Sequence, residues 1–560
     1  MVNQNRPSVK LPLAKTGKIS ALIERLGLAG SFTWFSFFAV AVLAALSGML
    51  GGGLVKKAPA LCGIILAVWF LTLCYALIHQ AKLRHTPWSK WLFQNLYNSP
   101  ANMVLTLLFL LLAATVLFSF WDYAVVRATI DPALTSPDVR PENVGASWGV
   151  LIGASKLILT GTLKLEFLPR VWAAFWITLG LALLTWITSR FNSLSASSVV
   201  RNIISGSWLA LIPVIYILLA GVPFTGAFLN PGVLLTGEML VLSSFAILYW
   251  QKVVNFSYKQ LAGWAIAWPA VYLAWRASGA SGYFPVINVD HWGGLLLTMI
   301  ITVFSIVVSF PIGVGLALGR RSSVRGIPAW FIYAACAGLA AWGLAGSTPG
   351  MLADARNWFE KILAFWPLLI LASAFLFQNT FKGNVISAAS TLYIEIVRGV
   401  PLITILFMAI VMAPLFFPEG IKLKNTWAVL AGYTLFNSAY IAEIVRGGLQ
   451  AIPGGQFEAA DSLGLNSLQK VRFIILPQAL TLVIPALVGQ FVGVFKSSSL
   501  VGIVGLFDLM GIVASVTGNP RWQGLRTELY IFVAVLYFFG SFAMTSYSRR
   551  LEKRLEIGKR

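Results

Sequence analysis

Long apolar runs recur along the whole chain, and short polar loops separate them. Each run is close to the roughly 20 residues that a helix needs to cross a lipid bilayer. The pattern therefore predicts an all-α polytopic integral membrane protein with about fourteen spans, the exact number depending on how proline-interrupted runs are divided. The expected spans are 30–50, 60–79, 101–121, 170–188, 204–221, 232–250, 260–276, 293–319, 328–345, 363–378, 385–413, 427–446, 474–495 and 529–548.

Composition supports this class. Of the 560 residues, 58% are hydrophobic and 11% are charged, and the mean hydropathy is +0.81. Soluble domains carry about a quarter charged residues, so a soluble protein is excluded. The first apolar run follows a basic leader and has no clear cleavage pattern, which favours a retained span over a signal peptide.

The net charge of +22 is explained by the orientation of the chain in the membrane. If the N-terminus is cytoplasmic, the loops on that side and the basic tail 551–560 carry most of the positive charge, which is the positive-inside pattern. Nucleic acid is therefore not an expected partner. An even number of spans places both termini in the cytoplasm. The loop residues concerned are Lys82, Arg84, Lys90, Arg190, Arg201, Lys252, Lys259, Arg320, Arg321, Arg325, Lys382, Lys470 and Arg472.

The spans divide into two regions. Residues 1–290 form an N-terminal membrane region whose loops carry no motif with assignable chemistry, and "WGVLIGASKLILTG" within the loop 122–169 reads as a helix at the membrane surface. From 291 to 550, glycine, proline and polar residues punctuate the spans. This second region is expected to carry the function.

One polar loop in the second region, "FEAADSLGLNSLQKVRFIILP" at 457–477, has strong local signals. "FEAADSL" predicts a short helix with a small face at Ala459 and Ala460. Gly464 supplies a stop with positive φ. Asn466 with Gln469 three residues later resembles an N-cap for a second helix, which Pro477 then ends or kinks. An ordinary amphipathic loop would have the same shape, so the shape alone does not assign a role.

The spacing in this loop is more specific than its shape. Glu-Ala-Ala, three residues, Gly, nine residues, Ile, one residue and Leu-Pro resembles the signature of permease subunits of ATP-binding-cassette importers. Stretches at 293–322, 393–407, 436–465 and 475–505 resemble the polar amino-acid branch of these permeases. The long N-terminal region resembles general and acidic-and-amide amino-acid permeases. The matching loop residues are Glu458, Ala459, Ala460, Gly464, Ile474, Leu476 and Pro477.

The resemblance implies a MetI-like (type I importer) permease core in a bacterial inner (plasma) membrane. It implies a second homologous permease subunit in a heterodimer, two ATP-binding-cassette ATPase subunits and an extracytoplasmic amino-acid-binding protein. The loop 447–473 would be the cytoplasmic ATPase-coupling loop. The sequence has no Gly-x-x-x-x-Gly-Lys-Ser/Thr phosphate loop, since "AKTGKIS" at 14–20 lacks the first glycine. ATP and Mg are therefore expected on the partner ATPase, and this chain is expected to bind no cofactor and no metal.

Two features depart from the family pattern. An additional pair of spans is inserted at about 326–384, which keeps the topology unchanged. In "FKSSSL" at 495–500, Ser497 stands where the family usually has an acidic residue.

Polar residues inside the spans are costly and usually face a path or a partner. The candidates for the substrate path are Asn437, Ser438, Tyr440, Glu443, Lys496, Ser497 and Ser498. For Glu443, an ion pair with Arg446 is an equally good interpretation. Because Ser497 removes the expected acid and Lys496 could attract a carboxylate, we predict that neutral polar or acidic amino acids are favoured over arginine and lysine.

A broken helix is predicted where Arg398, Gly399 and Pro401 follow Glu395. The spacing of Glu395 and Arg398 allows a local ion pair, and the Gly-Pro break favours a structural hinge.

Three alternatives have different requirements. A secondary transporter needs inverted repeats, yet only "EIVRG" recurs, at 395–399 and 443–447. An enzyme needs clustered catalytic groups, such as paired histidines within spans, whereas the sequence has only three histidines, His79, His85 and His291. An accessory permease half without its own substrate site is the strongest of the three, and Ser497 supports it.

Overall fold

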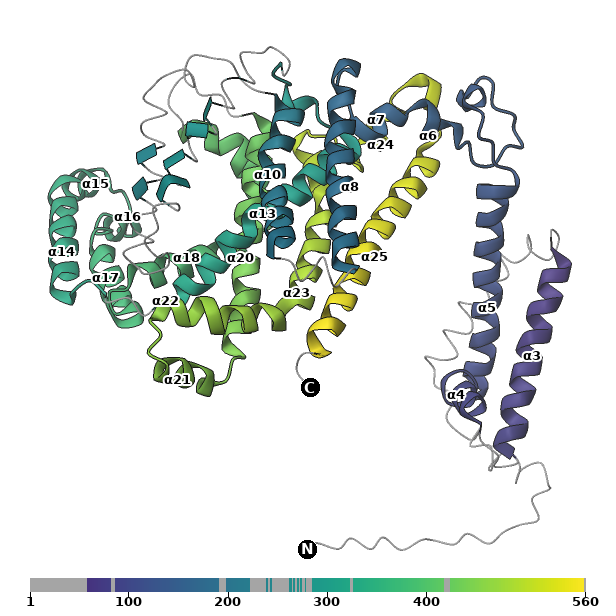
Figure 1. Cartoon of the computed structure of the whole chain (residues 1–560), viewed down its shortest axis with the longest axis horizontal. Helices are drawn as coiled ribbons and strands as arrows, with labels where there is room; N and C mark the ends of the chain where they lie inside the picture. Colours follow the sequence, from purple (N-terminus) through teal and green to yellow (C-terminus); the bar gives the residue numbers. More distant parts are fainter. Residues whose placement is uncertain are drawn as a thin grey trace, which may run out of the picture. The chain divides into compact units, whose positions relative to one another are not determined.

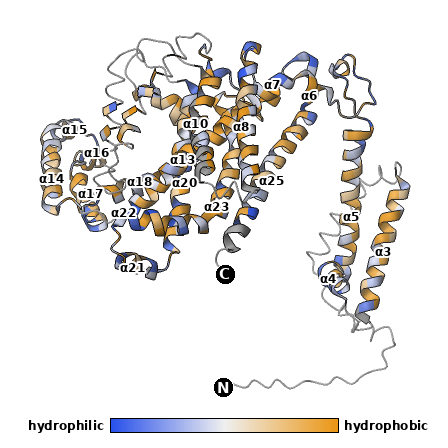
Figure 2. Cartoon of the chain, in the orientation of Figure 1, coloured by the Kyte–Doolittle hydropathy of each residue, from blue (hydrophilic) through white to orange (hydrophobic). Residues whose placement is uncertain are grey.

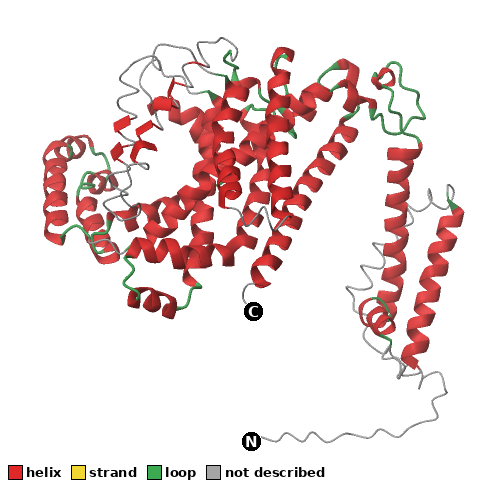
Figure 3. Cartoon of the chain, viewed as in Figure 1, coloured by secondary structure: helices red, strands yellow, loops and turns green. Residues whose placement is uncertain are grey.

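The computed structural model describes residues 58–81, 86–190, 198–221, 285–322, 326–416 and 424–557, with isolated residues between 238 and 277. Within these ranges the chain is helical, and none of them forms a strand (Figure 3). The chain divides into two compact units, Met1–Val150 and Leu151–Arg560. This division concerns packing, whereas the boundary expected at residue 291 concerns sequence character and stays a prediction.

The first unit contains two long apolar helices, α3 (Pro59–Ala81) and α5 (Pro100–Trp121), joined by the short helix α4 (Pro87–Asn95). Most residues of α3 and α5 are hydrophobic and are coloured orange in Figure 2. Thr86 caps α4 in a capping box with Ser89. The buried Tyr97 places its hydroxyl 2.8 Å from that of Thr72 and so holds the joint to α3.

Short helices lie at and directly after the boundary between the two units. The stretch expected at the membrane surface forms α6 (Gly149–Gly153) and α7 (Ser155–Thr160), each too short to span a bilayer. The long helices α8 (Leu168–Arg190) and α10 (Ser198–Ala220) follow and pack against each other.

Four long helices form the centre of the second unit, and Figure 1 shows them in teal, green and yellow. They are α13 (Gly294–Arg320), α20 (Asn425–Gln450), α23 (Leu476–Ser497) and α25 (Arg526–Ile557). Helix α20 packs on both α13 and α23, and α23 packs on α25. Two apolar clusters fill the spaces, one around Leu297 and Tyr433 and one around Ile441 and Ile475.

Helices α13 and α20 approach closely because small residues line the contact. Thr298, Thr302, Ser305 and Ser309 are buried along α13. A Cβ at Gly313 would lie 2.7 Å from Cγ2 of Ile441 and 2.8 Å from the backbone oxygen of Ser438. Close backbone contact through small residues is the usual way that membrane helices associate.

The inserted pair of spans forms a group of four helices. They are α14 (Ala329–Gly346), α15 (Thr348–Asp354), α16 (Trp358–Leu363) and α17 (Leu368–Phe381). Helix α14 packs against α17. The short helices α15 and α16 occupy what the sequence presented as a loop, and Asn357 and Glu360 cap α16 in a capping box.

The expected break after Arg398 is present. Helix α18 (Val385–Gly399) ends at the glycine, and α19 (Leu402–Phe407) begins directly after Pro401. The two directions differ by 106°. Proline has no amide hydrogen and disfavours helix in the residue before it, which explains the position of the break.

Eight helices in the described residues are long and apolar enough to span a membrane, or nine if the bent pair counts as one span. The expected spans 30–50 and most of 232–250 and 260–276 lie outside the described residues. The expected span 363–378 corresponds to α17, which is a shorter apolar helix. The helical membrane class is confirmed, and the count of fourteen stays a prediction.

Candidate functional site

The polar loop at 457–477 folds into a compact projection, which we call the knob and define as residues 454–475. Its first helix, α21 (Gly454–Ser462), ends in a Schellman motif. The amide of Leu465 donates to the oxygen of Ala460, and that of Gly464 donates to Asp461. Gly464 has a φ of +69°, so the sequence-based prediction of positive φ is confirmed. Figure 1 shows α21 below the long helices.

The second helix of the knob is the single turn α22 (Ser467–Lys470). The expected cap is confirmed, since the side chains of Asn466 and Gln469 accept each other's backbone amides at 2.9 and 3.1 Å. Lys470 forms an ion pair with Asp461 and ties the two helices together. The irregularity expected at Pro477 is present: α22 ends at Lys470, the π-helical turn Val471–Ile475 follows, and Pro477 lies in the first turn of α23, where a missing amide hydrogen is tolerated.

The surface of the knob differs from the expected one at one position. Ala460 is completely buried, so the small exposed face consists of Ala459 beside Glu458. Leu463, at the end of α21, is 73% exposed. Ile475 is buried in the cluster that contains Val445 of α20, which anchors the knob to the long helices.

The other motif residues of the loop follow the knob into α23. Ile474 and Leu476 are partly buried against the same apolar cluster, and Pro477 is exposed. The motif therefore includes residues that face outward as well as residues that anchor the loop.

A cluster of five charged side chains lies where α13, α18 and α20 end near the knob. Arg446 donates to Glu443 from Nε at 2.8 Å and from Nη2 at 2.5 Å, so the expected ion pair is present. Glu443 also lies 3.5 Å from Arg320 and 3.7 Å from Arg398. The partner of Glu395 is Arg320, at 2.8 Å. The local pair that spacing allowed between Glu395 and Arg398 is thus replaced by contacts between helices.

The candidate path residues on α20 make contacts to neighbouring helices. Asn437 is 2% exposed and accepts a hydrogen bond of 2.9 Å from Gln490 of α23. The hydroxyl of Ser438 is buried and lies 2.8 Å from that of Tyr393 on α18.

Tyr440 is the third path candidate on this helix, and it lies beside the hinge. Its ring centroid is 4.7 Å from that of Phe436 and 5.6 Å from the guanidinium of Arg398. The contact joins a path candidate to a hinge candidate.

The candidates at the end of α23 differ in exposure. Lys496 is exposed, Ser497 is partly buried and Ser498 is completely buried. Ser497 donates from its hydroxyl to the oxygen of Val494 at 3.2 Å. Ser498 donates to the oxygen of Phe495 at 2.8 Å. Of these three candidates, Lys496 and Ser497 have accessible side chains.

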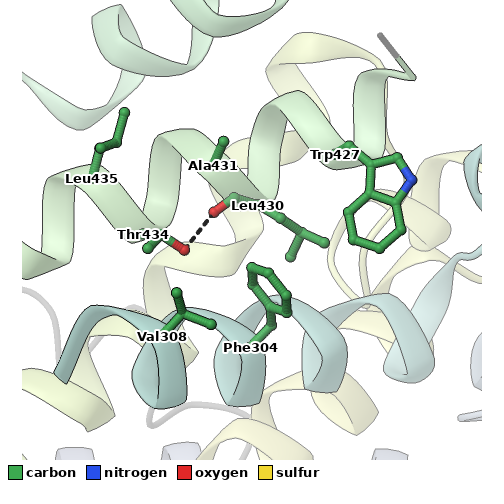
Figure 4. Close-up of a pocket in the computed structure, with 7 residues that line it drawn as sticks. All are labelled: Phe304, Val308, Trp427, Leu430, Ala431, Thr434 and Leu435. Carbon is green, nitrogen blue, oxygen red and sulfur yellow. Dashed lines mark hydrogen bonds between the residues drawn. The ribbon is translucent and has the colours of Figure 1, made fainter. Parts of the chain in front are cut away.

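An apolar pocket of about 350 Å³ lies between α13 and α20 (Figure 4). Its polar side chain, Thr434, already donates to the oxygen of Leu430 at 2.8 Å. Such a lining suits an apolar group and not a polar amino acid. The lining residues are Phe304, Val308, Trp427, Leu430, Ala431, Thr434 and Leu435.

Sequence reasoning did not single out Gln490, Tyr393 or Arg320 as site residues. Gln490 and Tyr393 are polar residues within apolar runs, which was an available signal. Arg320 lies at the end of a span, where basic residues are ordinary topological markers. Its role as a link between helices becomes visible only in three dimensions.

Comparison with known proteins places this arrangement in a family. Residues 367–557 match the model of the binding-protein-dependent transport system inner membrane component. The inner membrane amino-acid ABC transporter permease protein YhdY of Escherichia coli (strain K12) is 37% identical over 323 residues, which is 57% of this chain and 71% of the relative. A second relative, the glutamate/glutamine/aspartate/asparagine transport system permease protein BztC of Rhodobacter capsulatus, is 30% identical over 495 residues, or 83% of this chain and 93% of the relative.

The chain belongs to the family of amino-acid ABC transporter permeases. A further relative, the probable glutamine ABC transporter permease protein GlnP of Bacillus subtilis (strain 168), is 34% identical over 173 residues, 31% of this permease and 78% of the relative. The predicted resemblance, the helical permease fold and the role of a transport subunit are confirmed. The permease is integral to an inner membrane. Its relatives are transport subunits, so it is assigned to transport and not to enzymes.

Proposed function

We propose that this permease is one half of an ATP-driven importer of polar amino acids and that the knob docks the ATPase. The observation that carries the proposal is the knob itself. Its family motif folds into a rigid projection in which Glu458 and Ala459 face outward and Leu463 is exposed at the tip. The small side chain of Ala459 beside Glu458 leaves room for another protein to approach the helix closely.

ATP hydrolysis is assigned to two separate ATPase subunits, because no phosphate-cradling loop is found in this sequence. The other partners would be a second homologous permease half, in a heterodimer, and an extracytoplasmic binding protein. The family description names a binding-protein-dependent system, which supports the binding protein.

The knob is assigned to the cytoplasmic side together with both termini. Arg549 and Arg550 are exposed near the end of α25, and Arg320 and Arg321 end α13. Basic residues at these span ends agree with the positive-inside rule.

The substrate class favoured is neutral polar or acidic amino acids. Lys496 is exposed and can attract a carboxylate, and Ser497 beside it carries no negative charge. BztC is named for the transport of glutamate, glutamine, aspartate and asparagine, and GlnP for glutamine. The substrates named for these two relatives agree with this choice.

A second candidate is an accessory half without its own substrate site. It is favoured by the observation that Asn437, Ser438 and Ser498 are buried and hydrogen-bonded within the chain. Side chains that already have partners are less available to a substrate.

The docking assignment is tested by co-expressing the permease with the second half and candidate ATP-binding-cassette ATPases. Native mass spectrometry of the purified complex should show two permease halves and two ATPases. Glu458→Lys should release the ATPases while the chain stays in the membrane, and Glu166→Lys, an exposed charge reversal away from the knob, should not. An unchanged complex with Glu458→Lys would count against the knob as the docking site.

A further inference from the structure

The charged cluster near the knob joins α13, α18 and α20. Helix α20 leads into the knob, and α18 leads into the broken span. Arg320 is the last residue of α13, and its Nη1 lies 2.8 Å from Oε1 of Glu395 on α18 and 3.5 Å from Oε2 of Glu443 on α20. One guanidinium is thus shared by carboxylates from two other helices. Both contacts come from Nη1, which is within ion-pair distance of the two carboxylates but makes no hydrogen bond to them, so the bridge depends on the positive charge and its position.

On one side, the cluster continues to the knob. Arg321 donates to the backbone oxygen of Leu449 at 2.8 Å, one residue before α20 ends. The next buried residue, Ile452, shares an apolar cluster with Ile475, the last residue of the knob. The end of α13 is therefore fixed to the segment from which the knob projects.

On the other side, the cluster continues to the broken span. Arg398 lies directly before the break at Gly399, 3.7 Å from Glu443 and with its guanidinium 5.6 Å from the ring of Tyr440. The five charged side chains thus join the 106° bend to the ends of α13 and α20, and Arg321 and the apolar cluster of Ile452 continue the connection to the knob.

These ion pairs are partly shielded from water. The side chains of Arg320, Glu443 and Arg446 are 24 to 26% exposed, whereas Glu395 is 55% exposed. Charges at partly buried sites interact more strongly than surface pairs, which contribute little. The pair of Glu443 with Arg446 is both short and partly shielded, whereas the pair of Arg320 with Glu395 is short but more exposed to water.

We propose that Arg320 is a positioning residue that transmits movement of the knob to the broken span through Glu395 and Glu443. This inference rests on the proposed function, because it requires an ATPase on the knob. Arg320 need not touch the substrate. Its contribution is to make α13, α18 and α20 move as one body when the knob moves.

The test uses the full complex in proteoliposomes and measures glutamine uptake and ATP hydrolysis in the same preparation. Arg320→Gln should lower the number of glutamine molecules taken up per ATP by about tenfold, with hydrolysis within about twofold of wild type. Glu395→Gln removes one of the two bridges and the more exposed one, so a reduction of about threefold is expected. Arg320→Lys keeps the charge and should recover part of the loss.

Lys382→Gln is the matched control, since it removes an exposed positive charge beside the start of α18 outside the cluster. It should leave the ratio unchanged. The proposal is overturned if Arg320→Gln keeps the wild-type ratio, or if uptake and hydrolysis fall in proportion. If Arg320→Gln does not assemble into the complex, Glu395→Gln provides the test. An unchanged ratio of glutamine uptake to ATP hydrolysis in that variant would also overturn the proposal. A wild-type permease that never holds an ATPase would overturn the proposed function instead.

Discussion

The side-chain amide of Gln490 donates a hydrogen bond of 2.9 Å to Oδ1 of Asn437 and so joins α23 to α20. Asn437 also donates from Nδ2 to the backbone oxygen of Tyr433 at 2.8 Å. Removing Gln490 leaves the buried amide oxygen of Asn437 without this hydrogen bond, which costs about 1 to 3 kcal/mol, and removing Asn437 leaves the partly buried amide of Gln490 without it. Asn437→Ala and Gln490→Ala should each lower the thermal stability of the purified permease.

The interaction between the two residues is measured by a double-mutant cycle. We expect a coupling energy of about 0.5 to 1.5 kcal/mol, the range for hydrogen bonds between membrane helices. The exposed pair Gln478 and Gln456, at 3.1 Å, is the matched control and should give a coupling near zero. Strictly additive losses at Asn437 and Gln490 would show that the pair does not hold the helices together.

Local signals in the sequence predicted the local structure well. The positive φ of Gly464, the cap at Asn466 and the break at Gly399 each depend on a residue and its near neighbours, and all three are present. The burial of Ala460 could not be predicted in this way. It depends on how α21 leans on the turn at Val471–Ile475, which no residue within α21 specifies.

Contacts between distant segments were not predictable from spacing. Glu395 has an arginine three residues later in the sequence, and yet its partner is Arg320 from another helix. An i, i+3 pair gains only a few tenths of a kcal/mol, so packing between helices readily replaces it. The membrane class depends on the apolar pattern of each segment and so followed from the sequence. The links within the candidate site depend on packing between segments and did not.

Gly464 should be sensitive to substitution through its backbone alone. No atom lies within 4 Å of a Cβ added there, and the φ of +69° is unfavourable for other residues. Gly464→Val should destabilise the knob by about 1 to 2 kcal/mol or more and reduce the amount of bound ATPase. Asn tolerates this conformation better, so Gly464→Asn should have a smaller effect.

Gly455→Val is the matched control for this prediction. This residue also has no atom within 4 Å of an added Cβ, and it is not among the residues with positive φ. The measurement is the ratio of ATPase to permease after purification. Equal ratios for the valine variants at 455 and 464 would contradict the conformational explanation.

Asp508 should give the stability of the second unit a dependence on pH. Its carboxylate is completely buried, accepting from the amide of Gly511 at 2.8 Å and from the hydroxyl of Tyr537 at 3.1 Å. Burial raises the pKa of Asp508, although these hydrogen bonds act in the opposite direction. A raised pKa in the folded state means that stability falls as pH rises from the ordinary aspartate value of about 4 through the raised value.

Asp508→Asn removes the titration and keeps an oxygen for the amide of Gly511. Thermal unfolding of both proteins from about pH 4 to pH 8 is the measurement. The asparagine variant should gain stability relative to wild type as pH rises, and the gain should level off above the raised pKa. Two parallel curves would show that Asp508 does not titrate across this range.

The preference for neutral or acidic substrates depends on Ser497. Its side chain is partly buried beside the exposed Lys496, and its backbone oxygen accepts from the hydroxyl of Tyr433. A carboxylate at 497 would neutralise the attraction of Lys496 for an anionic substrate and would supply the partner that a cationic side chain needs. Ser497→Asp should therefore weaken glutamate and glutamine uptake by about fivefold or more and admit arginine.

Ser499→Asp is the matched control. It introduces the same charge two residues further on, at a side chain that donates to the backbone oxygen of Lys496. Uptake of labelled glutamate, glutamine and arginine by the reconstituted full complex separates the outcomes. A change in selectivity with Ser497→Asp alone places a substrate contact at this position. If wild type takes up arginine best, or if both variants behave as wild type, selectivity resides in the partner half or in the binding protein. That result would favour the accessory role, because the buried polar side chains on α20 then hold helices together and have no contact with the substrate.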